Sequence, residues 1–378
     1  MQGYGEFPVG DANAVKIWAK QVEVAERDYS EIAPLIGSDQ NSIIQEKSEL
    51  AKGPGDQVKF NLRAVLQGSG FTENETAEGN GEELTFSQDA IVINELGNVV
   101  KNPSDNTIDA QRVPFNLRAQ GRDALAEWYG NRKAVTFFNQ VCGYTPAWNG
   151  GVPTATAGPK FTGLNPVTAP ASASGLVRQI WAGAVSNDQS LTDTDIFTVQ
   201  MIDKAVTRAR LGIQKIKPIT VNGAKKYVMY IHDVQVEQLR TATGRGGWLD
   251  IQKAALEGAG KHGIYNGALG EWNNVVLRRS PNVTNGVDSG NGAPVTNVKR
   301  AVLLGAQAAV CAYGRRTNPA KGQYRYSEEL KDHGRRLETG IWGIWGLKKT
   351  LFQAPIGGSM VNTDYGALVV STWAPDPT

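Results

Sequence analysis

Near the N-terminus, apolar residues recur every three or four positions. Within residues 11–29, Val15 and Trp18 follow this spacing, which predicts an amphipathic helix. Turn-forming residues then interrupt the pattern and end in a Gly-Pro-Gly sequence at 53–55. We therefore expect residues 1–55 to form an N-terminal arm.

After the arm, apolar and polar positions alternate, which is the period of a strand with one buried face. Phe60, Leu62 and Leu66 lie on the apolar side, and a returning strand over 83–96 would complete an extended hairpin loop spanning 56–106. A two-stranded ribbon is only marginally stable alone in water. We predict that these three side chains pack on an adjacent subunit.

The residues between the two strands are acidic and contain no Lys or Arg. Five glutamates gather there: Glu73, Glu75, Glu78, Glu82 and Glu83. Their mutual repulsion would be relieved by a basic surface on a neighbouring subunit. Three arginines of the next helical segment are the leading candidates: Arg118, Arg122 and Arg132. The alternative is a tip that is simply solvated.

The longest helical pattern falls within 107–145. Leu117, Leu125 and Trp128 belong to its apolar stripe, and Pro114 confines the regular helix to the residues that follow it. A helix of about 25 residues is about 38 Å long, more than most single domains need. We expect it to act as a spine.

The second half of the chain is mixed in character. Residues 146–185 are rich in Pro, Gly and Ala and predict an insertion or junction, and 186–335 contains a predicted helix over 192–211. A hairpin with the turn Asn222-Gly223 follows, and strands are expected to return within 336–378.

Composition narrows the function classes. The 378 residues carry 39 Lys and Arg against 37 Asp and Glu, a net charge of +2, which argues against a protein whose main task is to grip nucleic acid or an anionic membrane. The N-terminal residues lack a basic region followed by an apolar stretch, so we expect no secretory signal and folding in a cytoplasm. No apolar run approaches the roughly 18 residues of a membrane span.

Candidate chemistry is scarce. The chain has no GxSxG, GxxxxGK[ST] or HExxH motif, and His232, His262 and His333 lie far apart in sequence. Cys142 and Cys311 belong to no CxxC pair and are expected to be buried, reduced thiols. We predict no catalytic, cofactor-binding or metal-binding residue, and a protein that is not an enzyme.

Two short motifs could suggest chemistry and have simpler interpretations. Gly258–Gly263 matches GxGxxG, but a helix-like segment precedes it where a dinucleotide loop requires a strand. Asp193 and Asp195 have DxD spacing, yet at the start of a predicted helix they indicate a cap. What remains is an arm, a long hairpin and a spine that all need a surface outside the monomer, which favours an assembly protein.

In this order, the parts resemble tailed-phage major capsid proteins of the Hong Kong 97 type and, more narrowly, the N-four-type podophage major capsid family. The motifs that carry the resemblance are Val15-Lys-Ile-Trp18, Leu50–Asp56 with Val58-Lys-Phe60, Glu78-Gly79, Glu82-Glu-Leu84, Leu117-Arg118 with Leu125 and Trp128, Gly346–Phe352 and Asp364-Tyr-Gly366. Each is short, so their order along the chain carries the argument.

The resemblance implies an α+β fold with an N-terminal arm, an extended β-hairpin loop, a long spine helix and a mixed α/β axial domain. On this basis 186–335 would be mainly axial, and a peripheral domain would combine the spine (107–145) with the return strands (336–378). The implied function is that of a coat protein, which assembles into an icosahedral shell around the double-stranded DNA genome of a tailed bacteriophage.

The resemblance also implies partners. These are further copies of the chain in hexamers and pentamers, scaffolding, portal and decoration proteins, and packaged DNA held by weak nonspecific contact, with no cofactor and no membrane. The protein would reside in the virion capsid after assembly in the host bacterial cytoplasm. Two alternatives stay open: a nanocompartment shell protein of the same fold, and a small-oligomer enzyme or carbohydrate-binding module.

Overall fold

The computed structural model describes residues 31–49, 54–63, 70–81, 84, 86–105, 107–112, 116–144, 148–149, 152–153, 165–241, 268–314, 324–356 and 359–377. The predicted helix over 11–29 and three predicted contact residues, Leu66, Glu82 and Glu83, lie outside this set. Among the helices described, none is both long and apolar enough to cross a membrane.

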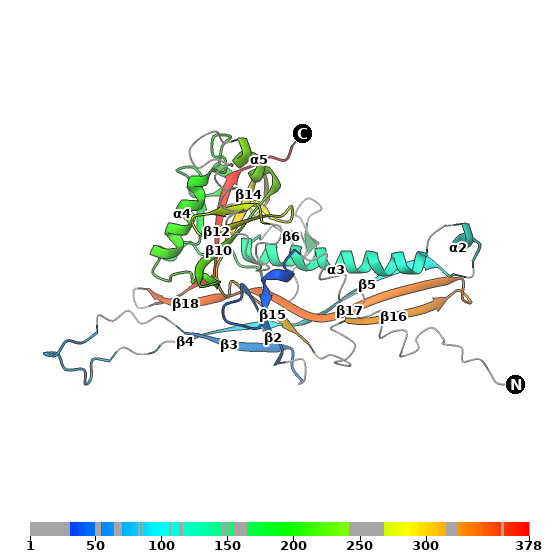
Figure 1. Cartoon of the computed structure of the whole chain (residues 1–378), viewed down its shortest axis with the longest axis horizontal. Coiled ribbons are helices and arrows are strands. Elements are labelled where there is room, and N and C mark those ends of the chain that lie inside the picture. The colour runs from blue at the N-terminus through cyan, green and yellow to red at the C-terminus, as the bar shows by residue number, and fades with distance from the viewer. Residues whose placement is uncertain are drawn as a thin grey trace.

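The described chain has a compact part and an elongated part, with a long loop extending from the body at the end opposite the spine (Figure 1). The compact part carries an eight-stranded sheet, and the elongated part carries α3 (Leu117–Cys142) along a six-stranded sheet. The predicted α+β class is therefore confirmed.

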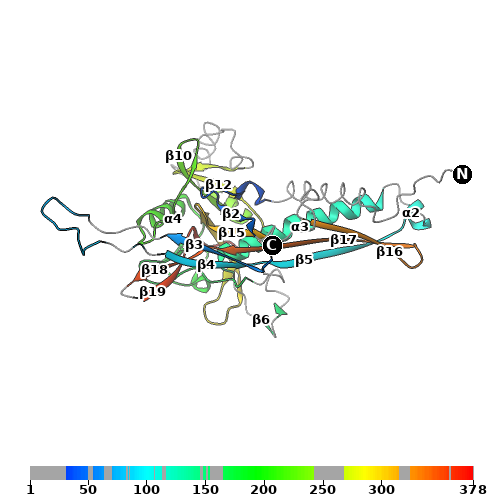
Figure 2. The same cartoon turned by 90° about the horizontal axis from the view of Figure 1, so that it is seen from below.

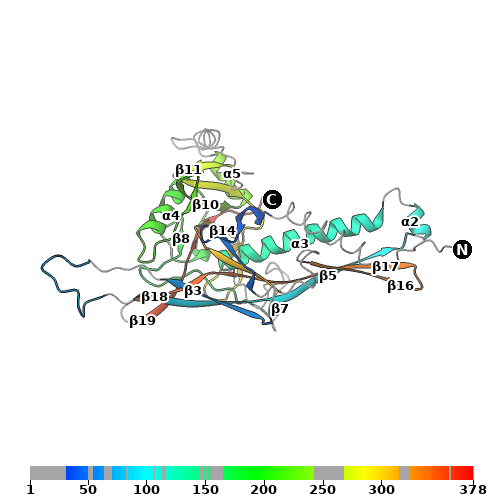
Figure 3. The ribbon, with the colours of Figure 1, turned by 60° about the horizontal axis from the view of Figure 1, so that its bottom comes forward.

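The six-stranded sheet supports the spine helix. Its strands run in the order β1 (Ile36–Gly37), β2 (Ile44–Lys47), β15 (Ala309–Tyr313), β17 (Arg336–Lys349) and β16 (Tyr324–Lys331), with β5 (Asn94–Pro103) on the other edge of β17. Figure 3 shows α3 lying along β5 and β17. Leu125 and Tyr129 of the helix are fully buried in one core with Ile341 and Trp345 of β17, as expected for an apolar stripe at helical spacing.

Local sequence explains where α3 begins and ends. Asn116 caps it by accepting a hydrogen bond from the Ala119 amide, and the short helix α2 (Ile108–Arg112) comes before it. Gly143 ends it in the left-handed conformation with φ 62°, where an added Cβ would lie 2.6 Å from Pro170. The predicted spine helix is thus confirmed, and it starts after Pro114 as expected.

The eight-stranded sheet is buried on both faces. Its order is β11 (Gly270–Trp272), β12 (Val275–Arg279), β10 (Ala224–Ile231), β14 (Pro294–Leu304), β20 (Ala367–Trp373) and β8 (Gln179–Trp181), with β9 (Ile219–Val221) on β10 and β13 (Asn285–Val287) on β14. Met229 packs in a core with α4 (Val199–Leu211) and α5 (Asp233–Thr241), whereas Tyr230 packs in the core that contains α3. Two buried faces account for the continuous apolar runs in these strands.

Two local predictions in this part had different outcomes. The hairpin β9–β10 is confirmed, and its turn residues Asn222 and Gly223 have φ 50° and 81°. The helix predicted over 192–211 begins only at Val199. Asp195 instead accepts hydrogen bonds from the backbone and hydroxyl of Thr192 and closes a separate turn.

The extended hairpin consists of β3 (Gln57–Arg63) and β4 (Phe86–Val92), which lie beside a second hairpin, β18 (Leu351–Ile356) and β19 (Ser359–Asp364) (Figure 2). The returning strand predicted over 83–96 is divided, because β4 ends at Val92 and β5 then joins the spine sheet. Asn165 accepts from the Val92 amide and donates to its carbonyl at this break.

The sheets do not follow the predicted division of the chain. β15 and β16 fall within 186–335 yet belong to the spine sheet, and β20 falls within 336–378 yet pairs with β14 and β8 of the other sheet. The arm also contributes, since β2 pairs with β15. Strand pairing thus joins segments that are distant in sequence, and the division into axial and peripheral domains stays a prediction. Short elements complete the fold: the 3-10 helices η1 (Ala33–Leu35) and η3 (Asp188–Ser190), and the hairpin β6 (Trp148–Asn149) with β7 (Val152–Pro153).

Candidate assembly surfaces

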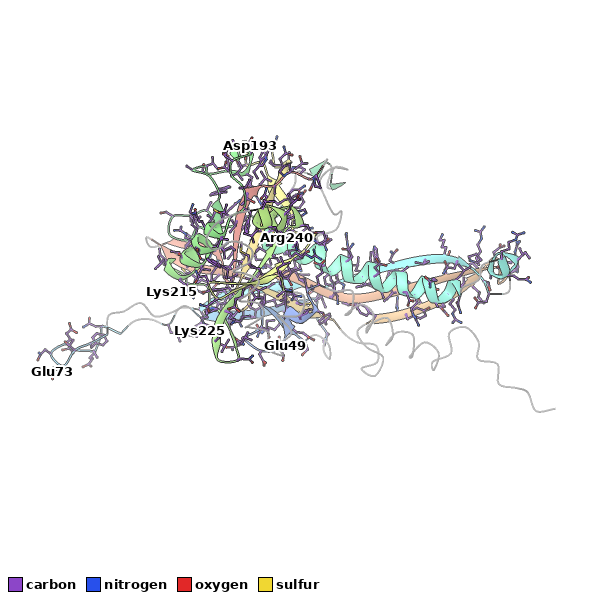
Figure 4. The ribbon with its side chains drawn as sticks, turned by 45° about the horizontal axis from the view of Figure 1, so that its top comes forward. Glu49, Glu73, Asp193, Lys215, Lys225 and Arg240 are labelled. Carbon is purple, nitrogen blue, oxygen red and sulfur yellow. The ribbon has the colours of Figure 1, made fainter. Side chains whose placement is uncertain are left out.

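The acidic tip, defined as residues 70–81, projects from the body and carries Glu73 at its far end (Figure 4). Its described side chains are all exposed, including Glu75 and Glu78, and Phe71 is 49% exposed. Its hydrogen bonds are local, such as that from the Thr72 amide to the Glu75 carboxylate at 2.9 Å. The tip therefore presents both negative charge and apolar surface to solvent.

The base of the hairpin packs within its own chain. Phe60 and Leu62 are 9% and 6% exposed and share a core with Ile91, Phe352 and Tyr365. Their proposed contact with an adjacent subunit stays a prediction, but the structure already supplies them with intramolecular partners. The exposed apolar side chains of this hairpin are others: Phe86 at 55% and Leu84 at 49%.

Arg118, at the start of α3, is held by a carboxylate of its own chain. Its Nε donates to Glu328 Oε1 at 2.7 Å and its Nη2 donates to Oε2, while the Tyr326 hydroxyl donates to the same carboxylate at 2.6 Å. The hydrogen bond that it donates to Glu328 raises the pKa of Arg118. The sequence alone predicted that Arg118 could contact a neighbouring subunit. In the structure it forms a bidentate ion pair with Glu328 of β16.

The other two candidate arginines are also involved in local structure. Arg122 forms an ion pair with Asp123 at 2.7 Å. Arg132 is partly buried, and that burial lowers its pKa. The helix starts at the end of the molecule opposite the acidic tip (Figure 1), so the tip does not meet these residues within one chain. Their contact with the tip of another subunit stays a prediction.

A buried ion pair in the compact part holds an arginine against the end of the spine helix, and sequence reasoning missed it. Arg300 of β14 contacts Asp188 at 2.7 Å, with both side chains at least 94% buried, and its Nη1 donates to the Cys142 and Gly143 carbonyls at 3.2 and 2.9 Å. These carbonyls end α3, where the helix dipole favours a cation. The one signal in the sequence is an arginine directly before the apolar run 301–304.

Asp188 is saturated with donors. Its carboxylate also accepts from Gln179 Nε2 at 2.8 Å, Trp181 Nε1 at 2.9 Å and the Val287 amide at 2.9 Å. A buried charge pair is tolerated when its remaining hydrogen-bonding capacity is satisfied in this way. The pair fixes the end of the spine against the eight-stranded sheet.

Further buried cations hold the hairpins in place. Lys349, at the end of β17, pairs with Asp364 at 2.8 Å, with side chains 1% and 2% exposed. Lys348 donates to Asp89 of β4 and so ties the extended hairpin to the spine sheet. Burial lowers the pKa of Arg178 to about 10, and its Nε donates to the Asp364 carbonyl at 2.9 Å.

An aromatic cage surrounds another buried cation beneath the spine helix. The Lys133 ammonium lies 5.3, 5.2 and 5.9 Å from the ring centroids of Tyr313, Tyr324 and Trp345. A cation over aromatic faces is attracted by the ring quadrupoles. These contacts anchor α3 on β15, β16 and β17 and serve the fold.

Reactive chemistry is sparse where the structure can be described. Within those residues, no group of three or more His, Cys, Asp or Glu side chains is arranged to hold a metal ion. Cys142 and Cys311 are buried thiols that form no disulfide with each other, as expected, and burial raises the pKa of the Cys142 thiol. A thiol kept protonated and enclosed is a poor nucleophile.

Similarity to known proteins extends along nearly the whole chain. The phage capsid protein family matches residues 6–376. The major capsid protein of Pseudomonas phage KPP25 is 26% identical over 202 residues, which span 51% of this chain and 53% of that protein, about half its length.

Solved structures give the same result. The capsid of Ralstonia phage GP4 superposes with a TM-score of 0.75 and 28% identity, covering 100% of both chains. The capsid of cyanophage Pam1 has a TM-score of 0.63 at 20% identity over 92% of this chain and 93% of that one, which is a likeness of fold. With the family matched from residue 6 to residue 376, the chain belongs to the phage capsid protein family and is a structural protein, not an enzyme.

Proposed function

We propose that this chain is the major capsid protein of a tailed bacteriophage, the subunit that assembles into an icosahedral shell around double-stranded DNA. The observation that carries the proposal is the superposition on the Ralstonia phage GP4 capsid over the full length of both chains. The elongated shape supports it, because a loop that projects from the body exposes apolar and charged side chains that a neighbouring subunit could cover.

The finer assignment is a Hong Kong 97-type capsid protein of the N-four podophage group. In this assignment the compact part is the axial domain, whose copies meet around the centres of hexamers and pentamers, and the elongated part is the peripheral domain. The acidic tip reaches a basic surface of an adjacent subunit. Scaffolding, portal and decoration proteins complete the particle, which assembles in the host cytoplasm.

The charge balance fits a container for DNA. A net charge of +2 on 378 residues leaves little capacity for sequence-independent phosphate binding. Contact with packaged DNA is therefore weak and nonspecific, so that the genome can later leave the shell. Stability of the particle comes from contacts between protein subunits.

Expression of the chain together with the scaffold gene of its phage tests the proposal. Sedimentation and electron microscopy of the purified material should show closed shells. A chain that stayed monomeric or formed only a small ring under these conditions would contradict it. A non-capsid alternative would be favoured in that case.

A further inference from the structure

One stretch of the compact part is basic without any compensating acid. Residues 204–226 contain seven Lys or Arg and no Asp or Glu. We define the basic strip as the three exposed lysines that follow α4 with two exposed apolar residues: Leu211, Ile213, Lys215, Lys217 and Lys225. Figure 4 shows Lys215 and Lys225 on the side of the body from which the long loop extends.

The backbone conformation after α4 exposes the side chains of the strip to solvent. After α4 the chain alternates, so that Gln214 and Ile216 are buried while Ile213, Lys215 and Lys217 are exposed. The Ile216 amide donates to the Ala209 carbonyl at 2.9 Å, which fixes this alternation. The exposed side chains therefore share one face.

The lysines of the strip have no carboxylate partner among the described residues. Their neighbour Lys226 differs, since it pairs with Glu271 at 2.6 Å and is largely buried. Apolar surface accompanies the charge: Leu211 is 78% exposed and Ile213 is 46% exposed. Large exposed apolar side chains next to unpaired charges are typical of a protein contact, whereas phosphates are contacted by charged and polar groups.

A cavity of about 370 Å³ opens beside Lys217. Lys47 and the amide side chains of Gln40, Gln45 and Gln307 also line it, with Phe60 of the hairpin base. Of the described residues that line it, none is acidic. Two ammonium groups and several amide NH₂ groups are the donors that a carboxylate accepts from.

The acidic tip has the complementary chemistry. It combines Glu73, Glu75 and Glu78 with the half-exposed Phe71 and has no basic residue between positions 70 and 81. Charge and apolar surface thus match on the two segments. Within one chain the tip points away from the body (Figures 1 and 4), so the segment that fits the strip belongs to another copy.

We propose that the basic strip of one subunit receives the acidic tip of a second subunit, with a glutamate of the tip entering the cavity beside Lys47 and Lys217. This inference rests on the proposed shell function and names the surface that the tip contacts. The strip suits the tip better than the spine arginines do, because Arg118 and Arg122 already pair with carboxylates of their own chain. A tip that binds a different surface of the next copy makes a head-to-tail contact, and such contacts form a ring when the rotation between copies closes.

Site-directed cross-linking tests the contact in assembled shells. Cysteine is introduced at the tip as Ala77→Cys and on the strip as Leu211→Cys, and a short bismaleimide is added; the native Cys142 and Cys311 are buried. The double variant should give a ladder of covalent multimers in denaturing gels. The matched control combines Ala77→Cys with Glu329→Cys, whose site on β16 of the spine sheet is 72% exposed, and should stay mostly uncross-linked.

Charge reversal gives an independent readout. Reversal of the tip glutamates should slow assembly at low salt by about tenfold or more, and reversal of the strip lysines should do the same. The first set is Glu73→Lys, Glu75→Lys and Glu78→Lys. The second set is Lys215→Glu, Lys217→Glu and Lys225→Glu. Combining both sets should restore assembly to within about threefold of the parent, the scatter usual for such measurements.

A control set with the same change in charge tests whether the effect is specific to the strip or arises equally from basic residues of the spine sheet. It consists of Lys331→Glu, Arg335→Glu and Arg336→Glu, which are exposed at the turn between β16 and β17. The inference is overturned if shells form but the tip cross-links to the spine, or if the control set slows assembly as much as the strip set does. A parent chain that forms no shells would instead refute the proposed function itself.

Discussion

At the junction between the compact and elongated parts, stability depends on the buried carboxylate of Asp188. We predict that Asp188→Ala lowers the free energy of unfolding by about 3–5 kcal/mol, because the charge of Arg300 would stay buried without its counter-charge. Urea unfolding of dissociated subunits measures this. The exposed Glu329→Ala should change stability by about 0.5 kcal/mol or less. A loss below about 1 kcal/mol for Asp188→Ala would refute the structural role.

His232 should make stability depend on pH. Burial lowers its pKa and Lys299 lowers it further, while Asp376 and Asp233 act in the opposite direction. Its Nδ1 accepts from the Val234 amide at 3.3 Å, which requires the neutral ring. The unfolded chain therefore binds the proton more tightly than the folded chain does. The contribution of His232 to the free energy of unfolding is fully present above about pH 6.5 and is lost as the pH falls toward the lowered pKa.

The variant His232→Gln should consequently lose less stability than the parent between pH 7.5 and pH 5.5, values that span the ordinary histidine pKa of about 6.5. Denaturant titrations at the two pH values provide the comparison. His333→Gln, at an exposed turn, serves as the matched substitution outside the core. An identical loss of stability in the parent and in His232→Gln would show that this imidazole is not the group responsible.

Among the elements, the extended hairpin has buried side chains that stabilise the subunit and exposed side chains that are available for assembly. We predict that Phe60→Ala lowers subunit stability by about 3–5 kcal/mol, because it opens a cavity among Val58, Ile91 and Phe352. Phe86→Ala, on the partner strand and 55% exposed, should change the stability of isolated subunits by about 0.5 kcal/mol or less. Denaturation of both variants is the measurement. Equal effects would mean that the hairpin base is not packed as described.

Elements with local causes could be predicted from the sequence. The turn Asn222-Gly223 places the β9–β10 hairpin because its two positive φ angles suit those residues. The spine helix follows from its apolar stripe and from Pro114. Which strands join which sheet could not be predicted. For example, β2 pairs with β15, more than 260 residues later in the chain, and the hydrophobic pattern of a strand does not indicate which strand it pairs with.

Of the two candidate surfaces, only the acidic tip could be predicted from the sequence. The acidic tip is visible in the sequence because its glutamates lie within a few residues of one another in a turn-rich segment. The basic strip could not be predicted, since the sequence does not reveal that Lys215 and Lys217 share a face with exposed apolar side chains. The pairing of Arg118 with Glu328 joins positions 210 apart, and the cavity beside Lys217 is built from segments that meet only after folding.

For the whole molecule, the tip should guide assembly through electrostatics. Exposed pairs contribute only about 0.2–1 kcal/mol each and are screened beyond about 8–10 Å at physiological salt. Replacing the five glutamates between the hairpin strands, Glu73, Glu75, Glu78, Glu82 and Glu83, with glutamine should slow shell formation at low salt and have less effect at high salt. Light scattering during assembly at two salt concentrations follows this. Equal rates for variant and parent at low salt would favour a tip that is merely solvated.

The central claim concerns the state of the assembled protein. The most direct measurement is sedimentation and electron microscopy of the full chain expressed with its scaffold gene, because a shell and a small oligomer differ greatly in size. The account predicts closed icosahedral particles in which hexamers and pentamers are resolved. Material that sediments as a monomer or as a single small ring, with no closed particles in the images, would contradict it.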